Sequence, residues 1–256
     1  MRKTKISSVI LAVLLLLTGC GNVNDNSSSD AENFNIVQQL ETEHFSFFSK
    51  DEDMQCLKDL SNSLEDNYTR ILNDLDTSLS KKVDIYIYTD LNTYHRAANI
   101  SDTSTHVVGS ALPGYNVIQM VNPSNAELLP YSDFMKIIVH EFAHTAIMSI
   151  NTDVGTIPKW LNEGTASFEA KQDDGVEQLI SKAKSSNNLP SFIDLETDSE
   201  TFSKNGGYQF SYSIIDYIVK TYGYDKLIAL IKSPRDFENI LGVSKDDFHK
   251  QWIAQL

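Results

Sequence analysis

The chain has 256 residues, of which 41% are hydrophobic and 10% aromatic, so it can bury a sizeable core and does not have the composition of a disordered protein. Its formal net charge is −14 and no basic stripe is present, which argues against a nucleic-acid-binding protein. The chain contains only two cysteines, so no disulfide framework is expected.

The first twenty residues, MRKTKISSVILAVLLLLTGC, begin with three basic side chains and continue with a short apolar run. This run is too short for an ordinary membrane span, so residues 1–19 are predicted to be a secretion signal. The end, Leu17-Thr18-Gly19-Cys20, resembles a bacterial lipobox. The resemblance implies cleavage before Cys20 and a lipid on its sulfur, which would anchor the protein to the membrane. The alternatives are an ordinary signal peptide with a chance cysteine, or an uncleaved anchor.

Residues 20–33 comprise the predicted lipidated cysteine and a polar tether rich in Asn, Ser and Asp, which has nothing to bury. Residues 34–256 are expected to form a single domain. Cys56 lies in MQCLKDL and is interpreted as a small core residue of a helix.

Hydrophobic periodicity predicts the elements of this domain in chain order. Apolar residues recur every three or four positions over 51–75, which predicts a helix, and VDIYIYTD at 83–90 alternates as a strand does. LNTYHRAAN predicts a short helix, and 106–123 predicts two strands joined around Pro113-Gly114. Further helices are predicted at 131–150, 158–171, 175–185, 208–222, 224–232 and 245–255. A helix and a small sheet followed by helices indicate an α+β chain.

The helix predicted at 131–150 is apolar at nearly every position except HEFAH. His140 and His144 lie one turn apart, so both rings leave the same face with Cβ atoms ~6 Å apart and can chelate one zinc ion. Glu141 lies roughly 100° further round the helix, beside the histidine pair. A carboxylate in that position can act as a base toward a water held by the metal.

The H-E-x-x-H spacing matches by chance in about one chain of this length in a hundred, so it needs support. The alternative is two buried histidines bonded to backbone carbonyls and a salt-bridged Glu141. A catalytic zinc needs three protein ligands. A second helix, which begins at Pro158, brings Glu163 after a gap of eighteen residues. The alternative role for Glu163 is an exposed carboxylate favoured by the helix dipole.

HEFAH, the eighteen-residue gap and WLNEGTA resemble the gluzincin metallopeptidases, on the side of aminopeptidase N and more closely its small peptidase MA-like relatives. The resemblance covers roughly residues 80–255 and implies a mainly helical, thermolysin-like catalytic half. It implies His140, His144 and Glu163 as ligands of one Zn²⁺ per chain and Glu141 as the general base.

A later stretch, YQFSYSIIDYIVKTYGYDKLIALI, resembles the segment that carries a transition-state tyrosine in those enzymes. The resemblance implies Tyr208 in that role, with Tyr212, one turn on, as its competitor. The alternative for Tyr208 is a packing aromatic before a helix.

One departure from the family concerns substrate choice. The aminopeptidases carry a Gly-Ala-Met-Glu-Asn signature whose glutamate binds the free amine of the substrate, whereas no acidic residue occurs here from Val107 to Val121. An endopeptidase, or a hydrolase with another amide substrate, is therefore the better interpretation. A strand in this region is also available to pair with an extended peptide.

The ligand histidines are expected to need acceptors for their second nitrogen, and Ser167 and Glu169 are candidates. The remaining histidines are expected to be satisfied or at the surface, and QDDG at 172–175 is expected to be a solvated loop, with calcium binding as its alternative. These histidines are His44, His95, His106 and His249.

Three functions compete. The first is a monomeric zinc peptidase, lipid-anchored on the outer face of a bacterial membrane and acting on a peptide or protein substrate. The second is a non-catalytic lipoprotein that binds a peptide or a cell-envelope component on a peptidase-like scaffold. The third is a lipoprotein whose zinc is only structural. Glu141 favours the first, because neither a binder nor a structural site needs a base.

Overall fold

The computed structural model describes residues 35–50, 53–100, 107–125 and 129–256. The predicted signal peptide, Cys20 and the tether lie outside the described residues, as does His106. In the part of the chain that is described, no helix combines the length and the apolar character that crossing a bilayer requires.

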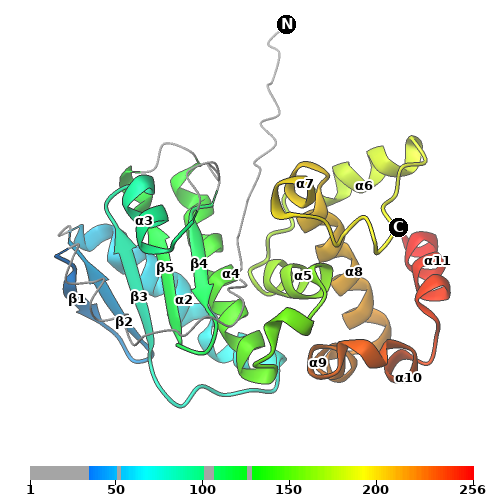
Figure 1. Cartoon of the computed structure of the whole chain (residues 1–256), viewed down its shortest axis with the longest axis horizontal. Helices are drawn as coiled ribbons and strands as arrows, with labels where there is room; N and C mark the ends of the chain where they lie inside the picture. The colour runs from blue at the N-terminus through cyan, green and yellow to red at the C-terminus, as the bar shows by residue number, and fades with distance from the viewer. Residues whose placement is uncertain (1–34, 51–52, 101–106, 126–128) are drawn as a thin grey trace, which may run out of the picture.

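A mixed sheet occupies one side of the molecule (Figure 1), and its spatial order within the described residues is β1-β2-β3-β5-β4. The strands β2, β3 and β5 run parallel, while β1 and β4 pair antiparallel at the two edges. The sequence predicted β3, β4 and β5, including the turn at Pro113-Gly114, but not β1 and β2. The bounds are β1 Val37–Glu41, β2 Phe45–Ser49, β3 Val83–Tyr88, β4 Gly109–Leu112 and β5 Val117–Val121.

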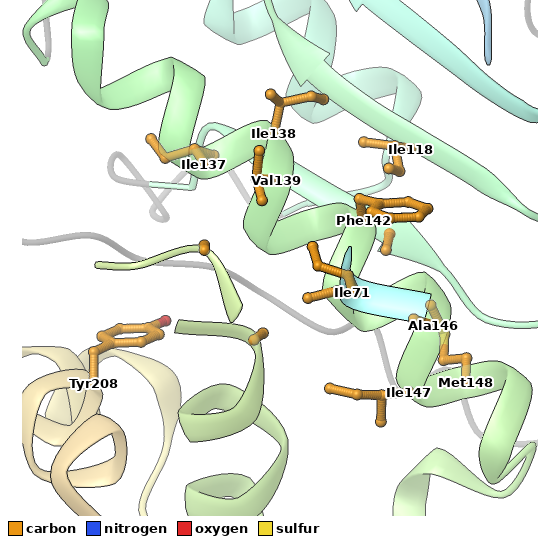
Figure 2. Packing of buried hydrophobic residues seen from close by; sticks show 14 of the residues in the cluster. Ile71, Ile118, Ile137, Ile138, Val139, Phe142, Ala146, Ile147, Met148 and Tyr208 are labelled. Atoms are coloured by element: carbon orange, nitrogen blue, oxygen red, sulfur yellow. The ribbon is translucent and has the colours of Figure 1, made fainter. Parts of the chain in front are cut away.

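Helix α2 (Met54–Asp74) and helix α4 (Tyr131–Ile150) pack against each other beside the sheet. Phe142 of α4 stacks on Tyr68 of α2 with 5.4 Å between ring centroids, and it meets Phe45 of β2 edge-on at the same distance. These contacts bury the middle of α4 almost completely, so the polar residues within it must find partners inside the protein. Figure 2 shows the apolar residues of α4 that make this core.

The other side of the molecule is helical (Figure 1), as the sequence predicted. Helix α5 (Lys159–Glu169) packs against both α4 and α8 (Gly207–Tyr222) and so connects the two sides. The short helices α7 and α10 were not predicted, because five or six residues are too few to show a period. The remaining helices are α3 Leu91–Ala97, α5 Lys159–Glu169, α6 Val176–Ser185, α7 Ser199–Lys204, α8 Gly207–Tyr222, α9 Tyr224–Lys232, α10 Phe237–Leu241 and α11 Lys245–Gln255.

The arrangement is α+β, with a small sheet and its helices followed by a helical half. Cys56 is a buried residue of α2, as predicted. Helix α4 is central to the molecule, because it lies between the two halves and carries the HEFAH sequence.

Candidate metal centre

Three side chains from two helices converge between the halves. His140 and His144 lie one turn apart on α4, and their Nε2 atoms are 3.0 Å from each other. Glu163 of α5 brings its Oε2 to 3.3 Å from Nε2 of His140 and to 3.5 Å from Nε2 of His144. One ligand atom from each residue lies within 4.8 Å of the other two. The three residues predicted as ligands are therefore adjacent.

The Nδ1 of each histidine, on the side of the ring away from Glu163, contacts the oxygen of a side-chain amide. The Oδ1 of Asn162 lies 3.0 Å from Nδ1 of His144, and the Oε1 of Gln172 lies 2.8 Å from Nδ1 of His140. An amide oxygen only accepts hydrogen bonds, so each Nδ1 carries the proton. The Nε2 of each ring then faces the space shared with Glu163 and is the atom that would bind a metal.

The predicted acceptors Ser167 and Glu169 were wrong. Glu169 is occupied by Arg70 and by the hydroxyl of Tyr224, and the hydroxyl of Ser167 is buried without a hydrogen-bond partner. The sequence does contain a signal for Asn162. This residue immediately precedes the ligand Glu163, in a helix that faces α4.

The electrostatics of this cluster favour a cation. Burial alone would raise the pKa of Glu163, but His144 and His140 lower it to about 2, so the carboxylate is ionised at neutral pH. Burial lowers the pKa of His140, which favours its neutral, ligating form. Burial would lower the pKa of His144 as well, but the carboxylate of Glu163 raises it, so this anionic oxygen draws positive charge into a space from which water is largely excluded. Two imidazole nitrogens and one carboxylate oxygen are a donor set that fits zinc.

Glu141 lies in the same interior but outside the three-atom cluster. Its side chain is fully buried and neither carboxylate oxygen has a hydrogen-bond partner. Burial raises its pKa to about 8, against an opposing effect of the backbone amide of Ala111. This amide does not form a hydrogen bond of normal geometry with the carboxylate. Strand β4 passes close by, since a Cβ added to Gly109 would lie 3.2 Å from Oε1 of Glu141. A buried carboxylate without a partner is costly, which indicates that its acceptor capacity serves something other than stability.

Of the two candidate tyrosines, Tyr208 faces a ligand. Its ring centroid lies 6.3 Å from that of His140 and 5.0 Å from that of Phe202. Figure 2 shows its hydroxyl directed away from α8, toward the side on which α4 lies. Tyr212 packs against Phe168 instead, with 5.4 Å between centroids. This geometry favours Tyr208 over Tyr212 as the group that reaches the centre.

The other described histidines are satisfied elsewhere, as predicted. His44 contacts Oε2 of Glu65 at 2.6 Å and stacks on Tyr68. The Nε2 of His95 lies 2.8 Å from the carbonyl of Val107. His249 makes a similar contact of 2.8 Å with the carbonyl of Pro190.

The segment QDDG at 172–175 is only partly the solvated loop that was predicted. Asp173 and Asp174 are exposed, and Asp174 pairs with Lys136 at 2.6 Å. Gln172, however, is half-buried and bonds to His140. Sequence reasoning missed this residue, because its position depends on how the chain turns at the end of α5.

Comparison with known families gives one match. The model of the Peptidase MA superfamily matches residues 63–246, which span more than two-thirds of the chain and include the histidine–glutamate cluster, Glu141 and Tyr208. No curated protein matches the sequence closely enough to be counted as a relative.

Proposed function

The chain belongs to the Peptidase MA superfamily, and on that premise we propose that it is a zinc metallopeptidase that hydrolyses internal peptide bonds. The observation that carries this proposal is the carboxylate of Glu141, which is fully buried and unpaired next to a three-residue cluster suited to zinc. A purely structural metal site would contain the cluster and would have no use for such a group.

His140, His144 and Glu163 would hold the zinc ion, and three protein ligands are the number typical of a catalytic rather than a structural site. The chemistry that zinc would supply there is a lowered pKa for a water, about 7, and the polarisation of a carbonyl oxygen. A bound cation would favour the ionised form of Glu141 against its raised pKa of about 8, and in that form Glu141 would accept the proton of the attacking water and deliver it to the leaving amine. Tyr208 donates a hydrogen bond to the oxygen on which negative charge develops in the transition state.

Strand β4 supplies the expected path for an extended substrate. It is an edge strand that pairs only with β5 among the described strands, and it passes next to Glu141. Gly109 allows the backbone of β4 to approach the carboxylate closely, since a side chain there would be crowded against Glu141. Because β4 and β5 carry no acidic residue to bind a free amine, the proposal is for an endopeptidase or another amide hydrolase.

The N-terminal sequence supports a location outside the cytoplasm. The basic start, the short apolar run and Leu17-Thr18-Gly19-Cys20 motivate a lipid-anchored protein on the outer face of a bacterial membrane. On this proposal the tether at 20–33 holds the catalytic part away from the bilayer, where it acts as a monomer on peptide or protein substrates.

A non-catalytic binding lipoprotein is the second candidate. The observation that favours it is burial, since each of the four residues of the centre is at most 3% exposed: His140, Glu141, His144 and Glu163. A substrate must reach this centre for hydrolysis, whereas a binder can hold its ligand at the surface.

The test compares the wild type with Glu141→Gln and Tyr208→Phe, each with its zinc content confirmed. Glutamine is nearly isosteric with glutamate but cannot accept the proton, so Glu141→Gln should lose about 10²–10⁴ in rate on a peptide library while it keeps zinc and fold. Tyr208→Phe should lose a similar or smaller factor, since one transition-state donor contributes about 3–4 kcal/mol at most.

Cleavage that persists undiminished in Glu141→Gln would show that the activity belongs to another site. Absence of cleavage by the zinc-loaded wild type, with equal peptide binding by all three proteins, would favour the binding lipoprotein.

A further inference from the structure

An arginine from the other half of the molecule binds the C-terminal end of α5. Nη1 of Arg70, on α2, lies 2.6 Å from Oε2 of Glu169, and Nη2 lies 2.5 Å from the backbone oxygen of the same residue. The guanidinium is itself oriented by Asn67 at 3.0 Å and by Asp74 at 3.1 Å. Arg70 therefore holds both the side chain and the last helical carbonyl of α5.

Both carboxylate oxygens of Glu169 are held by hydrogen bonds. Its side chain is fully buried, and its second oxygen, Oε1, accepts a hydrogen bond of 3.2 Å from the hydroxyl of Tyr224. A buried carboxylate with both oxygens paired fixes its own rotamer and the rotation of the helix end that carries it.

The chain after Glu169 makes a Schellman turn. The amide of Lys171 donates to the oxygen of Phe168 at 3.1 Å, and the amide of Gln172 donates to the oxygen of Ser167 at 3.0 Å. Lys171 has a φ of 52°, in the left-handed region that glycine normally occupies at this position. A lysine there disfavours the turn, so the turn depends on contacts made just before and just after it.

Those contacts join Arg70 to the metal centre. Arg70 contacts Glu169 immediately before the turn. At the end of the turn, Oε1 of Gln172 accepts a 2.8 Å hydrogen bond from Nδ1 of His140. Helix α5 also carries the ligand Glu163, six residues before Glu169. The end of this helix thus leads directly to the residue that orients His140.

We propose that Arg70 is a positioning residue of the metal centre. It stabilises the Schellman turn so that the side-chain amide of Gln172 orients the imidazole of His140. Arg70 contacts none of the three ligands and acts only through Glu169 and the turn. The inference rests on the proposed zinc site and adds to it a residue outside the site.

The experiment measures the zinc affinity of the full chain by competition with a chelator. The pH is kept above the pKa of Glu169, about 7, so that its carboxylate is ionised. Gln172→Leu removes the acceptor and should weaken zinc binding by about 10–100-fold, the usual range for a partner of a ligand histidine. Gln172→Glu keeps an acceptor and should bind at least as tightly as the wild type. Arg70→Lys keeps the charge but cannot reach both acceptors in the same geometry, and should weaken binding about tenfold.

The double variant separates positioning from general stability. If Arg70 acts through Gln172, then Arg70→Lys should cost nothing further in the Gln172→Leu background. Leu57→Ala, on the same helix as Arg70 but buried in the core, is the control: it should lower the unfolding temperature and leave zinc affinity within twofold of wild type. Visible spectra of the Co²⁺-substituted proteins report whether the ligand geometry changes in the same pattern.

The inference is overturned if Arg70→Lys binds zinc as the wild type does, if its loss is equally large in the Gln172→Leu background, or if Leu57→Ala loses as much affinity. A wild type that binds no zinc would instead refute the proposed metal site, and the inference with it. These two results are distinguished by the wild type alone.

Discussion

Gly164 should control how α8 is placed against the metal centre. A Cβ added there would lie 2.7 Å from the backbone oxygen of Ser211 and 2.8 Å from Cγ1 of Ile215, where ordinary contact begins at 3.4 Å. Gly164→Ala must therefore push α8 away from α5 by about 0.7 Å. Overpacking of this kind costs about 1–3 kcal/mol, against a gain of about 1 kcal/mol from replacing glycine within a helix. The net loss in free energy of unfolding is about 1 kcal/mol, or about 3 °C in Tm for a chain of this size.

The effect on turnover should be larger than the effect on stability. Gly164 follows the ligand Glu163, and α8 carries Tyr208, so separating the helices moves Tyr208 from its place beside His140. A shift of 1 Å can cost about 10²-fold in rate, so Gly164→Ala should lose about tenfold or more in kcat while it retains zinc.

The assays for Gly164→Ala are thermal unfolding and steady-state peptide cleavage. The matched control is Ser167→Ala on the same helix, which removes a buried hydroxyl without a partner and should change both quantities little. If Gly164→Ala keeps both the Tm and the kcat of the wild type within error, the close approach of α5 and α8 does not position Tyr208 and the reasoning is wrong.

Three further predictions concern location, substrate and pH. Cys20→Ser should release the protein from membranes or block its processing; unchanged fractionation and migration would exclude the lipobox. Peptides with blocked amino termini should be cut at least as well as free ones, because β4 and β5 lack an acidic amine anchor, and a clear preference for free amino termini would contradict this. Burial raises the pKa of Glu169 from 4.5 to about 7 against the opposing effect of Arg70, so its contribution to the free energy of unfolding is full below pH 4.5 and is lost as pH rises through about 7. Chemical denaturation of Glu169→Gln should therefore show a flatter pH profile than the wild type over this interval, and parallel profiles would be evidence against the raised pKa.

The ligand cluster was predictable from the sequence because helical geometry converts spacing into position. His140 and His144 share a face of any helix, and the apolar residues around them identify the helix as buried. The predicted α4 has the same bounds as the observed helix. Glu163 needed an added step, the resemblance of WLNEGTA to a known segment, since spacing alone does not fold α5 onto α4.

Other features were not predicted for physical reasons. Phe45 and Phe47 of β2 alternate with Ser46 as a strand should, but five residues are a weak signal, and the pairing partner β3 is far along the chain. Gln172 reaches His140 through a left-handed residue at the end of α5, and a lysine at that position gives no sign of the turn. Arg70 meets Glu169 across 99 residues of sequence, a contact that only the packing of α2 near α5 creates.

The most direct test of the central claim is the zinc content of the purified chain after loading and desalting, measured for the wild type, His144→Ala and Glu141→Gln. We expect close to one zinc per chain in the wild type and in Glu141→Gln, because Glu141 lies outside the ligand cluster, and none in His144→Ala. A wild type that remains metal-free, or a His144→Ala variant that keeps its zinc, would contradict the proposed metal centre.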